Sequence, residues 1–277
     1  MRGIWLKLGL VAWVGLGVLA PHSIHAEESA LIPLTTGDES RGWEGVGRIN
    51  LSTTGFCTGA LIAPDLVLTA AHCLFDKETG ARLPVETMEF LAGWRNGRAA
   101  AYRGVRRAIE HPDYVFGESD RIDRVAFDLA LLQLDQPIRN AGIAPFDTDA
   151  RPMVGDVIEV VSYGQDRAEA ASLQEQCHVM GQRSGVLVLT CSVDFGSSGA
   201  PVFSVRDGVA RIVSVISAKA EVDGAEVALA TDLTRPLARL RDEMAASGGA
   251  LHRATRIVPS TLTGSGNAGT VAKFIKP

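Results

Sequence analysis

Short apolar runs separated by turn residues fill the chain from about Gly45 to Asp232, and this pattern restricts the fold more than any other feature. Gly, Pro, Asp or Asn bounds most of the runs, as in the strands of β-barrels and sandwiches. The predicted strands are residues 46–51, 59–62, 66–70, 89–93, 129–134, 157–163, 186–190, 201–205, 212–217 and 226–230. We therefore expect an all-β chain.

One helix is predicted after the last strand. Leu233, Leu237, Leu240 and Met244 recur at helical spacing, with charged residues between them. The Ser-Gly-Gly sequence at 247–249 predicts the end of the helix. Residues 247–277 are rich in Thr, Ser, Gly and Ala, so we expect a flexible C-terminal tail.

The first 26 residues are typical of a signal peptide. Arg2 and Lys7 precede an uncharged run from Leu8 to Ala20, and Ala26 offers a small residue for cleavage. A retained membrane anchor is the alternative, but a spanning helix needs about 20 apolar residues. We expect export, to the periplasm or the medium of a bacterium, without stable membrane insertion after cleavage.

Charge and cysteine content narrow the class of protein further. The net charge of −5 becomes −7 when the first 26 residues, with two basic and no acidic side chains, are removed, and this argues against nucleic acid as a partner. Four cysteines in an exported chain predict two disulfides, with three pairings possible. Metal binding is the alternative, but no pair has the short C-x-x-C spacing of zinc sites, so we expect neither metal nor cofactor.

Three segments carry residues suited to nucleophilic catalysis. They are Leu-Thr-Ala-Ala-His-Cys at 68–73, Asp-Leu-Ala-Leu-Leu at 128–132 and Gly-Ser-Ser-Gly-Ala-Pro at 196–201. A serine hydroxyl needs a base, histidine titrates near neutrality, and a carboxylate holds the imidazole in the required tautomer. Each segment alone is usually structural. Together they predict Ser198 as nucleophile, His72 as base and Asp128 as its orienting partner.

These motifs, in the order His, Asp, Ser, resemble those of the trypsin-like (chymotrypsin-fold) serine peptidases over roughly residues 45–245. The resemblance implies two six-stranded antiparallel Greek-key β-barrels packed together, with a C-terminal α-helix. It implies a peptidase domain at 45–246, divided near 140–150, after an N-terminal segment at 27–44. A small polar residue before the nucleophile also resembles the bacterial glutamyl endopeptidase branch.

The same resemblance assigns further roles. It implies an oxyanion hole formed by the N–H groups of Gly196 and Ser198, and the disulfides Cys57–Cys73 and Cys177–Cys191. It also places four residues at the specificity pocket, namely Ser192, Ser217, Ala218 and Lys219. Ser217 takes the position of a serine that hydrogen-bonds the catalytic aspartate in that family. The expected protein is a monomeric serine endopeptidase that cleaves protein or peptide substrates through an acyl-enzyme.

Two departures from the family pattern change what is expected. Ser197 stands where many members have the aspartate that receives a new amino terminus, so we expect activation without that ion pair. Spacing would place such a terminus at residues 31–33, where the family's Ile-Val-Gly-Gly start is missing. Ser192 stands at the base of the pocket, where an acidic residue would favour Arg or Lys. Lys219 in the pocket wall could favour acidic substrates, block a deep pocket or face solvent.

Two other functions are alternatives to peptide-bond hydrolysis. A binding protein that kept the fold and lost activity is the first, although such proteins usually lose a triad residue and all three motifs are intact here. An exported lipase or esterase is the second, but its Gly-x-Ser-x-Gly motif and parallel βαβ pattern are missing.

Overall fold

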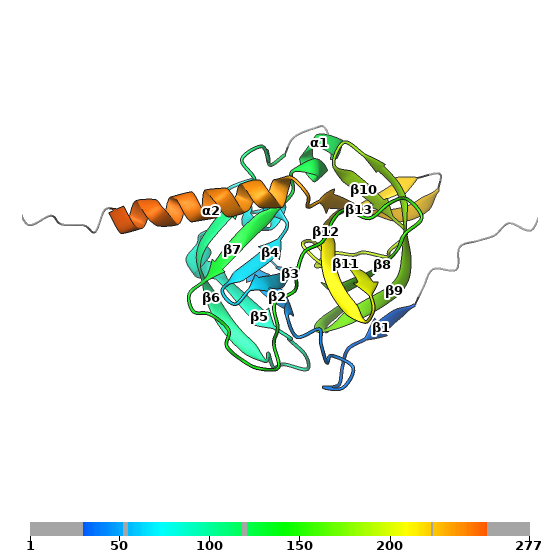
Figure 1. Ribbon diagram of the computed structural model, residues 1–277, viewed down its shortest axis with the longest axis horizontal. Coiled ribbons are helices and arrows are strands. Elements are labelled where there is room, and N and C mark those ends of the chain that lie inside the picture. Colours follow the sequence, from blue (N-terminus) through cyan, green and yellow to red (C-terminus); the bar gives the residue numbers. More distant parts are fainter. Residues whose placement is uncertain (1–29, 52–54, 118–120, 223, 254–277) are drawn as a thin grey trace, which may run out of the picture.

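The computed structural model describes residues 30–51, 55–117, 121–222 and 224–253, and its strands form two antiparallel sheets that lie side by side (Figure 1). The predicted signal peptide and the end of the predicted tail lie outside these residues. Among the described residues, no helix is both long enough and apolar enough to cross a bilayer.

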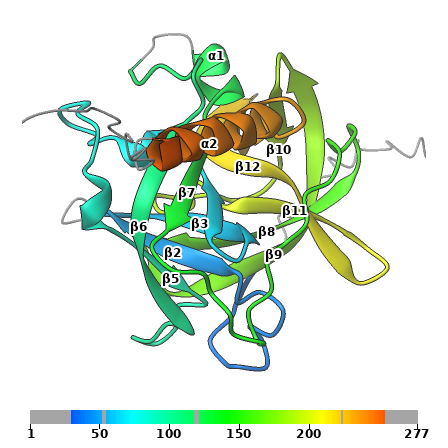
Figure 2. The same ribbon diagram turned by 60° about the vertical axis from the view of Figure 1, so that its left-hand side comes forward.

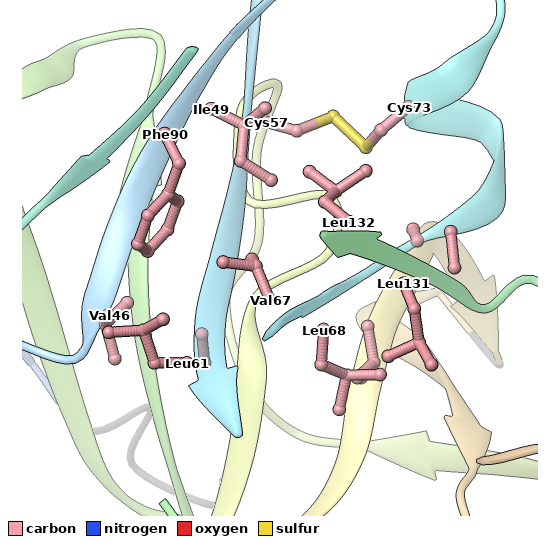
Figure 3. Packing of buried hydrophobic residues seen from close by; sticks show 14 of the residues in the cluster. Val46, Ile49, Cys57, Leu61, Val67, Leu68, Cys73, Phe90, Leu131 and Leu132 are labelled. Atoms are coloured by element: carbon pink, nitrogen blue, oxygen red, sulfur yellow. A yellow bond between two sulfur atoms is a disulfide. The ribbon is translucent and has the colours of Figure 1, made fainter. Parts of the chain in front are cut away.

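The first sheet is a closed barrel with the strand order β2-β3-β4-β7-β6-β5. Its strands are β2 (Val46–Leu51), β3 (Phe56–Ala63), β4 (Leu66–Thr69), β5 (Met88–Ala92), β6 (Ala101–Glu110) and β7 (Ala130–Leu134). Because β4 neighbours β7 instead of β5, the chain makes the long return connection of a Greek key. Apolar side chains from the strands fill the interior, as Figure 3 shows for Val46, Ile49, Leu61, Phe90 and Leu131.

The second sheet has the order β1-β9-β10-β13-β12-β11-β8, and β8 also pairs with β9. Its strands are β1 (Leu31–Pro33), β8 (Val157–Gly164), β9 (Arg167–Arg183), β10 (Val186–Leu189), β11 (Pro201–Arg206), β12 (Val209–Val222) and β13 (Ala225–Asp232). The β8–β9 pairing joins the ends of a six-stranded ring. From β8 onward the ring has the same order as the first barrel, so the all-β, two-barrel prediction is confirmed.

Three strands were not predicted from the sequence: β1, β6 and β9. Three arginines interrupt β6, and much of β9 is polar, so neither contains the apolar run of a buried strand. The short β1 extends the second sheet by pairing with β9, and the next residue, Leu34, is buried in the core. Residues 31–34 of the predicted N-terminal segment are therefore attached to the second sheet.

The helix α2 (Pro236–Arg253) crosses over β6 and β7 of the first barrel although it follows the second in sequence (Figures 1 and 2). Its Leu237, Leu240 and Met244 are buried, which confirms the predicted face. The predicted stop at 247–249 is wrong, because the helix continues to Arg253. Glycine costs a helix about 1 kcal/mol relative to alanine but keeps its N–H, so two glycines weaken a helix without ending it.

Candidate active site

His72 lies on a short 3₁₀ helix, η1 (Ala71–Leu74), that follows β4 directly. Ala70 and Ala71, the two residues before His72, are fully buried. A disulfide joins Cys73 to Cys57 on β3 (Figure 3). The imidazole itself stays partly exposed, with 19% of its side-chain surface accessible. The fold therefore presents a reactive side chain on a rigid turn.

Asp128 lies between the short helix α1 (Arg121–Ala126) and β7, and only 2% of its surface is exposed. Its Oδ1 accepts the backbone N–H of His72 at 2.8 Å, and its Oδ2 lies 2.7 Å from Nδ1 of the His72 ring. A carboxylate accepts only, so this contact places the ring proton on Nδ1 and leaves Nε2 as the basic nitrogen.

Ser217 completes this arrangement from β12 by donating its hydroxyl to Oδ2 of Asp128. The pairing of β12 with β13 is irregular between Ile216 and Ala218, which leaves Ser217 without a strand partner. A bulge of this kind redirects a side chain out of the regular alternation. The family resemblance implied this bond from Ser217 to the catalytic aspartate as well as a place in the pocket wall, and the structure contains the bond.

Ser198 lies in the turn between β10 and β11, and the first barrel fixes that turn. Its carbonyl accepts the N–H of Thr58 at 2.9 Å, and the Thr58 hydroxyl donates to the carbonyl of Gly196 at 2.8 Å. Gly196 and Gly199 have positive φ, at 96° and 79°. At Gly199 an added Cβ would overlap the Thr69 hydroxyl and the Thr58 carbonyl, so only glycine lets the turn approach β3 and β4 this closely.

A pocket of about 260 Å³ contains both His72 and Ser198. In the described part of the chain, hydrogen bonds connect Ser217, Asp128 and His72, and Ser198 shares the pocket without a direct hydrogen bond to His72. Such bonds are often long in the absence of substrate and shorten in the substrate complex. The three predicted triad residues are thus brought to one place from both barrels.

The N–H groups of Gly196 and Ser198 are available for a ligand. Across residues 194–200 the structure records no protein acceptor for either group. Two unoccupied backbone donors beside a serine hydroxyl can stabilise a developing oxyanion.

Three of the four predicted specificity residues line this pocket. Ser217, Ala218 and Lys219 line it, and Ser192 does not. The backbone N–H of Ser192 donates to Oε1 of the buried Gln174 at 2.8 Å.

Sequence reasoning missed several other wall residues, including Lys77, Asp194 and Phe195. The ammonium of Lys77, from the loop after η1, lies 5.3 Å from the Phe195 ring centroid, and Phe195 is 69% exposed. The place of Phe195, three residues before the nucleophile, was a signal that could have found it. Lys77 had none, because only the folded loop brings it to the pocket.

Both predicted disulfides are present, Cys57–Cys73 and Cys177–Cys191. Cys57, Cys73 and His72 lie close enough together to resemble a metal site. Both sulfur atoms are already oxidised in the disulfide, so they cannot supply the thiolates that a metal requires.

A larger cavity, of about 660 Å³, lies between the end of α1 and the start of α2, and its lining includes Arg151 and Asp232 but none of the triad residues. The smaller pocket is the candidate active site because His72 and Ser198 line it.

Comparison with known proteins agrees with this geometry. Residues 57–211 match the family model of the trypsin-like peptidase domain, a range that includes His72, Asp128 and Ser198. The glutamyl endopeptidase of Bacillus licheniformis is 26% identical over 153 residues, which are 55% of this chain and 46% of that protein. The modular serine protease of Drosophila melanogaster is 39% identical over 85 residues, 29% of this chain and 13% of that protein.

The chain thus spans less than half the length of these two curated relatives. A solved structure of a Glu endopeptidase in complex with MPD has the same fold, with a TM-score of 0.64 and 16% identity over 79% of this chain and 98% of that one. With the matched family model covering more than half of the sequence, the chain belongs to the trypsin-like peptidase domain family.

Proposed function

We propose that this protein is a serine endopeptidase in which Ser198, His72 and Asp128 form the catalytic triad. The observation that carries the proposal is the pair of hydrogen bonds from Ser217 to Asp128 and between Asp128 and His72, which ends at a pocket that also contains Ser198. For His72 to act as a general base, its imidazole must reach the substrate, and a buried carboxylate must hold the ring in the correct tautomer.

In this mechanism Oγ of Ser198 attacks the scissile carbonyl while Nε2 of His72 takes the hydroxyl proton. The N–H groups of Gly196 and Ser198 stabilise the negative oxygen of the tetrahedral intermediate. Collapse of that intermediate breaks the C–N bond, and His72 gives its proton to the leaving amine. Water then attacks the acyl-enzyme by the same route, which releases the carboxylic acid and restores Ser198.

The charges around the pocket bear on the substrate. Lys77 and Lys219 contribute positive charge and Asp194 negative charge, and Nζ of Lys219 pairs with Glu226 at 2.8 Å. Two lysines against one aspartate in the wall argue against a strong preference for Arg or Lys. A peptide-library cleavage profile tests this, and selective cleavage after Arg or Lys would contradict it.

We infer that the enzyme is exported as a monomer from a bacterial cell. The predicted signal peptide and the two disulfides support export, since disulfides persist in oxidising compartments. Amino-terminal sequencing of the protein recovered from the producing cells would locate the cleavage site, which we expect near Ala26.

Proteolysis by the purified protein tests the proposed activity. We expect cleavage of an unstructured protein such as casein, and a loss of at least about 10³-fold in kcat/KM for Ser198→Ala and for His72→Ala. Ser204→Ala, on β11 outside the pocket, is the matched control and should keep activity. If the folded wild-type protein binds peptides without cleaving them, the non-catalytic alternative replaces the proposal.

A further inference from the structure

The guanidinium of Arg167 lies beneath the loop that carries the nucleophile. It donates to the carbonyl of Ser162, to the Ser162 hydroxyl at 3.0 Å, and to the hydroxyl of Ser197 at 3.1 Å. Gly164 lies against it, because a Cβ at that position would be 3.0 Å from its Cζ atom. The side chain is therefore seated in a fitted site next to residue 198.

All three acceptors of this guanidinium are neutral. No carboxylate oxygen of the described residues lies within ion-pairing distance of Arg167. Burial lowers the pKa of Arg167, and the nearby charge of Asp194 opposes that shift. Burying a cation without a paired carboxylate costs free energy of folding. The contacts of Arg167 therefore point to a role other than stabilising the fold.

Ser197 connects Arg167 to the backbone of the oxyanion loop. It is fully buried, and its hydroxyl accepts from the N–H of Asp194 at 3.3 Å and donates to the carbonyl of Tyr163 at 3.1 Å. Ser197 lies between Gly196 and Ser198, whose N–H groups form the proposed oxyanion hole. A group that fixes Ser197 therefore fixes the direction of both donors.

The segment that carries Arg167 is itself held by the first barrel. The carbonyl of Ala168 accepts from the indole of Trp94 at 3.1 Å and from the guanidinium of Arg48 at 3.3 Å. The carbonyl of Glu169 accepts the N–H of Asn96 at 2.7 Å. Arg167 is thus presented by the anchored first residues of β9 and not by a free loop.

We propose that Arg167 is a positioning residue that holds residues 194–198 in the shape of a formed oxyanion hole, using a positive charge from within the chain. The inference rests on the proposed peptidase function. It explains how a loop with Ser197 in place of an aspartate can be ordered without a newly released amino terminus. The segment at which spacing would place such a terminus, Leu31–Pro33, is instead an exposed strand paired with β9.

Steady-state kinetics of Arg167→Met tests this. Loss of one oxyanion donor costs roughly 10²- to 10³-fold in kcat, and we expect kcat to fall about 10²-fold with KM changed less than about threefold. The inhibition constant of a peptide boronic acid, which mimics the tetrahedral intermediate, should rise in parallel with the loss of kcat/KM, while that of a product-like peptide should not change. Arg206→Met, an exposed arginine on β11, is the matched control.

A charge-pairing variant gives a second readout. Ser197→Asp should keep activity in the presence of Arg167, since the new carboxylate gains a partner, and should abolish it in the Arg167→Met background. Arg167→Lys, which keeps the charge and loses the forked geometry, should recover part of the lost kcat. If Arg167→Met does not fold, Arg167→Lys and Ser197→Asp carry the test alone.

The inference and the proposed function fail in different ways. If folded Arg167→Met keeps kcat and the boronic acid inhibition constant within about twofold of wild type, the role of Arg167 is refuted and the triad stands. Where Arg167→Met does not fold, an Arg167→Lys protein that matches wild type in kcat and in the inhibition constant refutes the role, and so does a loss of activity in Ser197→Asp with Arg167 present. If Ser198→Ala remains active, the proposed function itself is wrong.

Discussion

Single residues around the buried carboxylate determine whether the base is oriented. Asp128 receives three bonds, from the backbone N–H of His72, from its ring and from the hydroxyl of Ser217. The two bonds from His72 come from the turn that follows β4. The third depends on a bulge in a strand of the other barrel, which makes Ser217 the informative position.

Removing the hydroxyl in Ser217→Ala should impair catalysis and leave the fold unchanged. A hydrogen bond to a charged group contributes about 1.5–3 kcal/mol, so we expect kcat/KM to fall roughly 10- to 100-fold. Ser214→Ala, a buried serine on the same strand that donates to the Thr231 carbonyl, is the comparison and should affect stability more than kcat/KM. Equal kcat/KM for wild type and Ser217→Ala would show that the bond does not orient Asp128.

Substitutions at two glycines with similar backbone angles distinguish the cost of a left-handed backbone from the cost of steric overlap. Gly199 and Gly208 have φ of 79° and 74°, but only Gly199 has atoms where a Cβ would lie. Left-handed backbone costs a non-glycine residue about 1–2 kcal/mol, and overpacking adds about 1–3 kcal/mol. In urea unfolding, Gly199→Ala should lose clearly more stability than Gly208→Ala. Equal losses would mean that the close approach at the nucleophile turn is not tight.

At the scale of elements, α2 attaches the end of the chain to the first barrel. The guanidinium of Arg107 on β6 donates to the carbonyl of Met244 at 2.7 Å, and Arg239 lies 3.5 Å from Asp113. Asp113 belongs to the turn that contains His111, and the backbone N–H of His111 donates to the carbonyl of Leu129, next to Asp128. The helix thus supports the segment that delivers the triad carboxylate.

His111, in the segment that α2 contacts, should make the stability of the fold depend on pH. Burial lowers the pKa of His111, with Asp113 opposing the shift and Arg239 reinforcing it. Below about pH 6.5, the ordinary value for histidine, the unfolded chain binds a proton that the folded chain resists, so stability falls as pH falls. The Tm should drop between pH 7 and pH 5, and less so in His111→Asn, which keeps an acceptor for the N–H of Asp113. An identical Tm profile for both proteins would exclude His111 as the source.

At the scale of the whole molecule, the sequence predicted the class of fold better than its details. Ten apolar runs marked ten strands, because each places a continuous hydrophobic surface inside a barrel. The strands β6 and β9 were missed because neither contains an apolar run: three arginines interrupt β6, and β9 buries the polar Ser172 and Gln174. The shared strand order of the two barrels leaves no repeat in the sequence, since many different side chains satisfy the same topology.

Some residues of the candidate site could likewise be predicted from the sequence, and others could not. His72, Asp128 and Ser198 could be predicted because their chemistry requires fixed residue types within short motifs. The roles of Arg167 and Lys77 and the bond between Ser192 and Gln174 could not, because each depends on how distant parts of the chain meet. Ser197 was noticed as a departure, but only the structure shows the arginine that contacts it.

Covalent labelling tests the central claim, that Ser198 is a nucleophile activated by His72, most directly. The folded protein should react with a fluorophosphonate probe, and mass spectrometry of the digested product should locate one adduct on Ser198. Ser198→Ala and heat-unfolded wild type should not react, and Asp128→Asn should react at least about 10²-fold more slowly because the imidazole loses its tautomer. A folded wild-type protein that takes no label, or takes it on another residue, would contradict the account.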